Sequence, residues 1–159
     1  MAISLAERWS DHGPAATAGD VAFFLLKAAR LAASSPEALA PLEKAVNACA
    51  DLLRGNSHLL SAPQAADALC AMAFFRPKEE TLVRALADSA AAEEKVHQYF
   101  KNRECAKSLV RAAYGLGSAL IPHVGIFKQA WRLMSFHPEK ISAKWCAVIL
   151  WAANKVGVK

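Results

Sequence analysis

One sequence pattern occurs four times in this chain of 159 residues, at intervals of about 40 residues, and it restricts the possible folds more than any other feature. The four stretches are Phe23–Leu31, Ala66–Phe74, Ala106–Tyr114 and Ala147–Lys155. They superimpose on the shared leucines Leu26, Leu69, Leu109 and Leu150, which are 43, 40 and 41 residues apart. Self-similarity at such an interval is typical of repeat proteins, in which each unit packs mainly on its neighbours.

A second similar element follows each of the first three stretches, at Leu42–Val46, Leu82–Leu86 and Phe127–Trp131. Both kinds of element place apolar residues three and four positions apart, which indicates helices with one buried face. Prolines and glycines lie between the elements and favour turns there. The segment Ser4–Trp9 is a candidate remnant helix that would cover the first pair.

These observations predict an all-α fold, namely a short α-solenoid of helix-turn-helix repeats of about 40 residues. A single domain would span residues 1–159, with three and a half repeats at about 17–60, 61–100, 101–141 and 142–159. The last segment supplies only the first helix of a repeat. Its outer face therefore has no following unit, and we expect it either to cap the solenoid or to contact a partner.

The sequence does not indicate an enzyme, a cofactor or a metal site. The four cysteines (Cys49, Cys70, Cys105 and Cys146) form no CxxC pair, and we interpret them as small buried apolar residues. The five histidines are scattered, without metal-ligand spacing. Gly115 and Gly117 form a GxG, but a dinucleotide site needs GxGxxG after a strand.

Membrane insertion and secretion are not expected from the sequence. No stretch reaches the about 20 uncharged apolar residues that span a bilayer. The first residues, MAISLAERWSDHG, lack the charged start and apolar centre of a secretory signal.

Charge is distributed unevenly along the chain. Residues 1–94 contain 8 Lys/Arg and 12 Asp/Glu, a net charge of −4, whereas residues 95–159 contain 11 Lys/Arg and 2 Asp/Glu, a net charge of +9. Such asymmetry suggests a polyanionic partner for the basic half, with RNA favoured over a solvated helix face. The predicted RNA-binding residues are Arg103, Lys107, Arg111, Lys128, Arg132, Lys140 and Lys144. Of these, the first three form one stripe on a helix, and Tyr99, Tyr114 and the terminal tryptophans are candidates to stack on bases.

The C-terminal segment carries a second predicted surface. Trp145, Ile149 and Trp151 cannot all face one neighbouring helix, so we expect them to dock a partner subunit. An alternative function follows from this surface. The chain would then be an α-solenoid scaffold for protein–protein contacts within a large complex, without direct RNA contact.

The segments Ser61–Phe74, Ala106–Tyr114 and Ser142–Val156 resemble the organellar helical-repeat families. These are the octotricopeptide and heptatricopeptide repeats and the helical region of FAST-kinase-domain proteins, and the resemblance covers residues 17–159. It implies RNA binding in mitochondria, with plastid or cytoplasm as alternatives. It also implies a structural role in a ribonucleoprotein, namely that of a lineage-specific mitochondrial ribosomal protein contacting rRNA.

Overall fold

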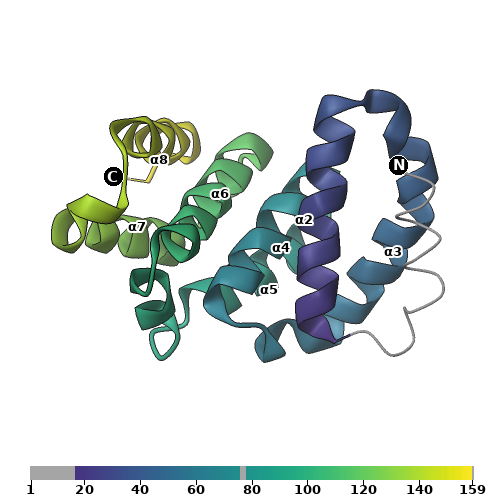
Figure 1. The fold of residues 1–159 in the computed structure, drawn as a ribbon, viewed down its shortest axis with the longest axis horizontal. Helices are drawn as coiled ribbons and strands as arrows, with labels where there is room; N and C mark the ends of the chain where they lie inside the picture. The colour runs from purple at the N-terminus through teal and green to yellow at the C-terminus, as the bar shows by residue number, and fades with distance from the viewer. Residues whose placement is uncertain (1–16, 76–77, 159) are drawn as a thin grey trace.

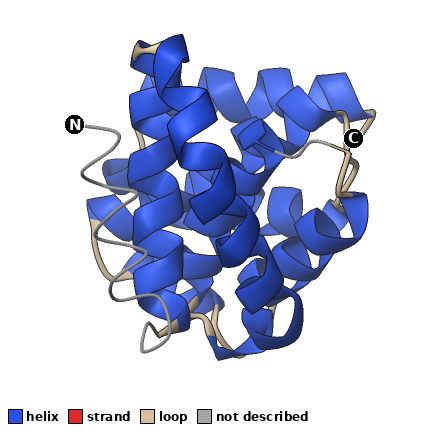
Figure 2. Cartoon of the chain, turned by 90° about the vertical axis from the view of Figure 1, so that its right-hand side faces the viewer, coloured by secondary structure: helices blue, strands red, loops and turns tan. Residues whose placement is uncertain are grey.

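The chain is built from α-helices, as predicted. The computed structural model describes residues 17–75 and 78–158, and within these ranges it contains helices and short loops and no strand (Figure 2). The α-helices are α2 (Ala18–Ser34), α3 (Leu39–Asn56), α4 (Ala62–Phe75), α5 (Glu80–Ala91), α6 (Arg103–Ala119), α7 (Val124–Phe136) and α8 (Ala143–Val156). The candidate helix at Ser4–Trp9 lies outside the described residues.

The helices form two rows. In the first row α2, α4, α6 and α8 pack side by side in chain order, with α4 between α2 and α6 (Figure 1). The second row consists of α3, α5 and α7, each of which follows a first-row helix and contacts it. Contacts within the second row are less extensive than those within the first.

Helix α4 is the centre of the core because it is covered on both sides. Its buried alanines are Ala62, Ala65, Ala66, Ala68, Ala71 and Ala73. Leu69 and Met72 fill the remaining space between the helices. A helix that is apolar on most of its surface needs neighbours on several sides, and the small side chains let α2 and α6 approach closely. No helix in the described ranges is long and apolar enough to cross a membrane.

Two glycines in α6 allow close contact with both neighbouring helices. A Cβ atom on Gly115 would lie 2.9 Å from Cα of Cys70 in α4, and one on Gly117 would lie 2.8 Å from Cα of Ala152 in α8. Glycine in a helix interior costs about 1 kcal/mol relative to alanine. Close packing of α6 on α4 and α8 thus explains why Gly115 and Gly117 form a GxG sequence, without a nucleotide-binding motif.

Side-chain caps define where several helices begin. Thr17 and Asp20 form a capping box at the start of α2. Asn102, His123 and Ser142 each accept a hydrogen bond from a backbone N–H in the first turn of α6, α7 and α8, respectively. These caps satisfy N–H groups that have no partner within the helix.

The segment between α5 and α6 is hydrogen-bonded to residues at and just before the start of α4. It contains the 3-10 helix η4 (Val96–Phe100). Lys95 Nζ donates to the carbonyls of His58 and Leu60 at 2.8 and 3.0 Å, and the fully buried hydroxyl of Tyr99 lies 2.9 Å from the carbonyl oxygens of Ala62 and Ala90. In the connection between α7 and α8, Lys140 Nζ donates a hydrogen bond to the carbonyl oxygen of Phe100.

Candidate nucleic-acid interface

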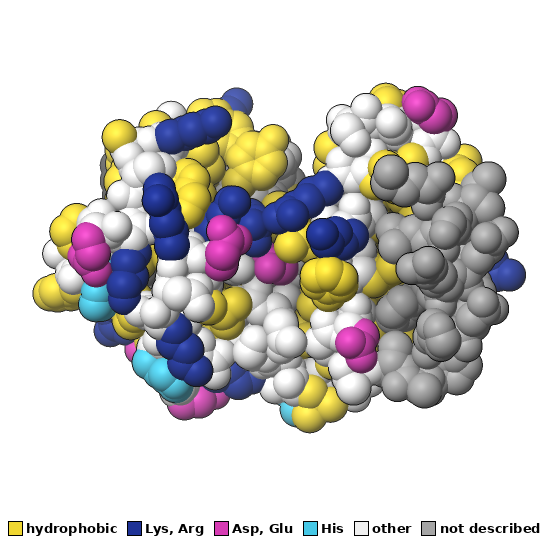
Figure 3. All heavy atoms as spheres, in the orientation of Figure 1, with side chains coloured by type: hydrophobic (Ala, Val, Ile, Leu, Met, Phe, Trp, Pro, Cys, Tyr) yellow, Lys and Arg dark blue, Asp and Glu magenta, His cyan; other side chains and the backbone are white. Residues whose placement is uncertain are grey.

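Basic and aromatic side chains lie together on the exposed face of the first row. Phe23, Lys27 and Arg30 follow one another at helical spacing on α2, and Arg103 and Lys107 do so on α6. Figure 3 shows Lys and Arg side chains gathered over α6 and α2, with hydrophobic side chains between them. We call the surface formed by Lys27, Arg30, Arg103, Lys107 and the residues between them the basic face.

A groove of about 320 Å³ lies in the basic face between α2 and α6, above α4. The view in Figure 3 is hollowed between the parts formed by α2 and by α6 with α8. The lining residues are Leu26, Ala29, Arg30, Ala33, Cys70, Phe74, Arg111, Tyr114, Gly115 and Ser118. Small residues on all three helices leave the space open, while Phe74 and Tyr114 supply aromatic rings that are about half exposed. The groove is therefore mainly apolar, with guanidinium groups beside it.

The Arg111 side chain is mostly buried and forms an ion pair with Asp67 of α4. Its Nη1 lies 2.9 Å from Asp67 Oδ1, and the two side chains are 16% and 18% exposed. Burial raises the pKa of Asp67, and the hydrogen bond from Arg111 acts in the opposite direction. Arg111 Nη2 is buried, makes no hydrogen bond, and lies 3.7 Å from Glu104 Oε2. The predicted stripe thus keeps only Arg103 and Lys107 as outward cations.

The rings of both tryptophans of α8 contact side chains of α6. The guanidinium of Arg103 lies 5.3 Å from the centre of the Trp145 ring, and Lys107 Nζ lies 6.0 Å from it. The Trp151 ring stacks on Tyr114 with 5.6 Å between ring centres and 27° between planes. Such contacts hold the aromatic rings in fixed positions beside the cations.

The predicted docking surface at Trp145, Ile149 and Trp151 is not one accessible surface in this structure. Ile149 is fully buried, because it points inward from α8 toward the core, whereas Trp151 is 41% exposed and Trp145 is partly buried. The large apolar residue of α8 that remains most exposed is Leu150, at 55%. Ile149 is therefore removed from the candidate surface and Leu150 takes its place.

Lys128 and Arg132 belong to the second row, and they pair with Glu93 rather than extending the stripe on α6. Lys128 Nζ lies 2.9 Å and Arg132 Nη1 2.6 Å from the carboxylate. These hydrogen bonds lower the pKa of Glu93 to about 2. Lys140 donates to a backbone carbonyl, as described above, while Lys144 is exposed at the start of α8.

Lys27 and Arg30 of the basic face were not among the residues predicted from the sequence, and Tyr99 was included as a stacking residue in addition to the buried Ile149. The charge asymmetry points to residues 95–159, yet the spacing of Phe23, Lys27 and Arg30 on the first helix shows the same basic and aromatic pattern. Tyr99 was expected as a stacking residue, but its ring is fully buried. Burial also raises the pKa of the Tyr99 hydroxyl.

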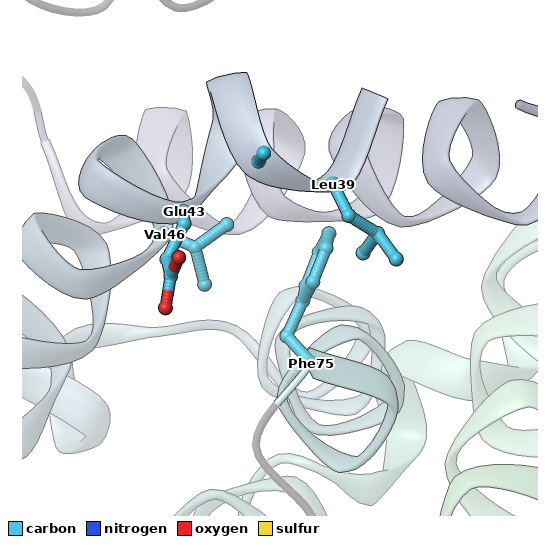
Figure 4. A pocket seen from close by; sticks show the side chains of 5 residues that line it. Leu39, Glu43, Val46 and Phe75 are labelled. Atoms are coloured by element: carbon cyan, nitrogen blue, oxygen red, sulfur yellow. The ribbon is translucent and has the colours of Figure 1, made fainter. Parts of the chain in front are cut away.

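A separate pocket of about 370 Å³ lies between α3 and the end of α4. Figure 4 shows Phe75 of α4 pointing toward Leu39 of α3, with Val46 and Glu43 on the same helix. Its lining is apolar apart from the carboxylate of Glu43. An acidic group disfavours a phosphate backbone, so this pocket is not part of the candidate interface.

Comparison of the chain with protein-family models, with curated proteins and with solved structures gives no match, so the geometry of the basic face is the basis for assigning a function.

Proposed function

We propose that this chain is a short α-solenoid that binds single-stranded RNA as a structural subunit of an organellar ribonucleoprotein. The observation that carries the proposal is the basic face, where Lys27, Arg30, Arg103 and Lys107 lie among exposed or partly exposed aromatic rings. Proteins that hold single-stranded nucleic acid combine cations along the backbone with aromatic platforms for the bases. A mitochondrial ribosome is the particle that the sequence resemblance implies.

Burial along the first row supports the solenoid part of this proposal. Among the leucines that the repeat aligns, Leu69 and Leu109 on the middle helices are fully buried. Leu26 on α2 is partly buried and Leu150 on α8 is exposed. This is the pattern expected if each helix covers the next, since α2 and α8 each have one first-row neighbour among the described helices and α4 and α6 each have two.

The cations of the basic face suit phosphate binding because few of them have an acidic partner. Among the described residues, Lys27, Arg30 and Arg103 make no ion pair, and Lys107 makes a loose one of 3.8 Å with Glu104. Contacts of Lys and Arg with phosphates supply most sequence-independent affinity for nucleic acid. Lys144, at the start of α8, extends the same set of exposed cations.

The particle is tested by fractionating native extract by size, with and without RNase, while following this protein. Under the proposal it runs in a large particle that RNase reduces to smaller species. If the protein runs in a complex whose size RNase leaves unchanged, the proposal is wrong.

The face is tested by a charge-reversal variant, Lys27→Glu/Arg103→Glu, in an RNA-binding assay with purified protein. Both side chains are exposed, so we expect the variant to fold. We expect it to lose RNA association, because the new carboxylates repel the phosphates. The matched control, Lys44→Glu/Lys78→Glu, changes the same amount of charge at exposed positions outside α2, α6 and α8 and keeps most of the affinity. Equal losses in both variants would assign the binding to net charge alone.

A second candidate function is a scaffold for protein–protein contacts, which the exposed Leu150 on α8 favours. Leu150→Ser discriminates between the two, because this side chain lies outside the contacts of Arg103, Lys107 and Tyr114 with the tryptophans. Loss of assembly with unchanged RNA affinity in this variant would support the scaffold. Unchanged assembly would argue against it.

A further inference from the structure

The groove between α2 and α6 has the size and chemistry of a site for one nucleotide. Its volume of about 320 Å³ is at the lower end of small-ligand sites, which span about 300–1,000 Å³. The apolar walls formed by Leu26, Ala29 and Ala33 suit a flat ring, and the exposed Arg30 beside them suits an anion.

Tyr114 is the ring best placed to receive a base. It lines the groove, is 51% exposed, and is supported from α8 by the Trp151 ring. A ring that is already held by a stacked neighbour loses little freedom when a ligand binds. Ser118, one helical turn after Tyr114, places a hydroxyl at the same wall for a hydrogen bond to the edge of a base.

The electrostatics of the groove favour an anionic ligand over a neutral one. Its two cations are Arg30 and Arg111. The acids that pair with Arg111 are Asp67, which accepts a hydrogen bond from it, and Glu104, whose Oε2 lies 3.7 Å from Arg111 Nη2. Arg30 is near enough to Asp67 to act in the direction that lowers its pKa, but it makes no ion pair among the described residues, so its exposed guanidinium is available to a phosphate. Cys70, which also lines the groove, is a neutral thiol, since burial raises its pKa to about 11.

We infer that this groove binds one unpaired nucleotide of the RNA, with its base against Tyr114 and Phe74 and its phosphate on Arg30. The inference rests on the proposed function and makes it more specific. It assigns the nucleotide to a site formed jointly by α2, α4 and α6, rather than to one helix.

The experiment measures binding of a short fluorescein-labelled oligouridine to the purified chain by fluorescence anisotropy. Two variants address the groove: Ser118→Phe fills it from an exposed position, and Arg30→Gln removes the cation. Ser135→Phe and Lys44→Gln are the matched controls, since both residues are exposed on second-row helices outside the groove. Thermal melting checks that all four variants fold.

We expect each groove variant to weaken binding about tenfold, a loss typical of removing one base stack or one charged contact, and the controls to bind like the unaltered chain. If the unaltered chain binds oligouridine and the groove variants bind equally well, the groove assignment is wrong and RNA binding by the chain stands. If the unaltered chain does not bind, the proposed function itself is wrong. If the groove variants lose only a protein partner, the groove is a peptide site and the inference falls.

Discussion

At the residue scale, the Asp67–Arg111 pair shows how burial and pairing oppose each other. The pKa of Asp67 is raised, so burial of the carboxylate outweighs the hydrogen bond from Arg111. The pair is therefore a poor source of net stability, although breaking it leaves a mostly buried charge without a partner. It connects α4 to α6 beneath the groove and fixes the Arg111 side chain there.

We expect Asp67→Ala to lower the free energy of unfolding by about 2–4 kcal/mol, because the Arg111 guanidinium is left without its partner. The double variant Asp67→Ala/Arg111→Met should recover much of this loss, since it removes the unpaired charge as well. Urea denaturation of the single and double variants measures both effects. Losses that simply add would show that the two side chains do not interact.

Glu93 gives the second prediction at this scale, a dependence of stability on pH. Its folded pKa is about 2, against 4.5 for an ordinary glutamate, because Lys128 and Arg132 donate hydrogen bonds to it. A lowered pKa stabilises the folded chain at pH values above about 4.5, and this contribution is lost as pH falls from 4.5 toward 2. At neutral pH we expect Glu93→Gln to be less stable than the unaltered chain. The difference should shrink between pH 4.5 and 2.5 in urea melts, and a constant difference would contradict the assignment.

At the element scale, the approach of α8 to α6 depends on Gly117. A Cβ atom at this position would lie 2.8 Å from both Cα and Cβ of Ala152, and the backbone atom cannot rotate out of the way. We expect Gly117→Ala to destabilise the chain by about 1–3 kcal/mol, even though alanine is the better helix former. Thermal or urea unfolding measures the change.

Gly55 provides the matched control for this prediction. It lies in the last turn of α3, and a Cβ atom there would meet nothing within 4 Å. Gly55→Ala should therefore raise stability by up to about 1 kcal/mol through helix propensity alone. If both alanine variants change stability in the same direction, close packing of α6 on α8 is not the reason for Gly117.

The elements themselves were largely predictable, because apolar spacing and the positions of prolines define helices locally. Each of the seven repeated segments that were expected to be helical lies within a described α-helix, and Leu69 and Leu109 of these segments are fully buried. Pairing between side chains was not predictable in the same way. Asp67 and Glu93 lie in the acidic part of the sequence, yet they pair with Arg111 and Arg132 of the basic part, since partners 44 and 39 residues apart meet only after folding.

At the scale of the whole molecule, these internal pairs change the meaning of the charge asymmetry. The net charge of +9 in residues 95–159 is an excess over acids in the same segment, not over acids nearby in space. Three of the seven predicted RNA-binding cations, namely Arg111, Lys128 and Arg132, are paired with Asp67 or Glu93. Lys140 is occupied by a backbone carbonyl. The cations that remain outward come from both halves of the sequence.

The number of outward cations predicts how RNA binding depends on salt. Lys27, Arg30, Arg103 and Lys144 make no ion pair among the described residues, whereas Lys107 has a loose pair with Glu104; if Lys107 keeps that pair, about four phosphates would be neutralised. For single-stranded nucleic acid this gives a slope of about −3 for the logarithm of the association constant against the logarithm of salt concentration. Engagement of all seven sequence-predicted cations together with Lys27 and Arg30 would instead give about −6. Anisotropy titrations of oligouridine over a series of KCl concentrations separate the two values. A slope near −6 would mean that Asp67 and Glu93 release their partners to the RNA, whereas a slope near −3 would leave the pairs that join the helices intact in the complex.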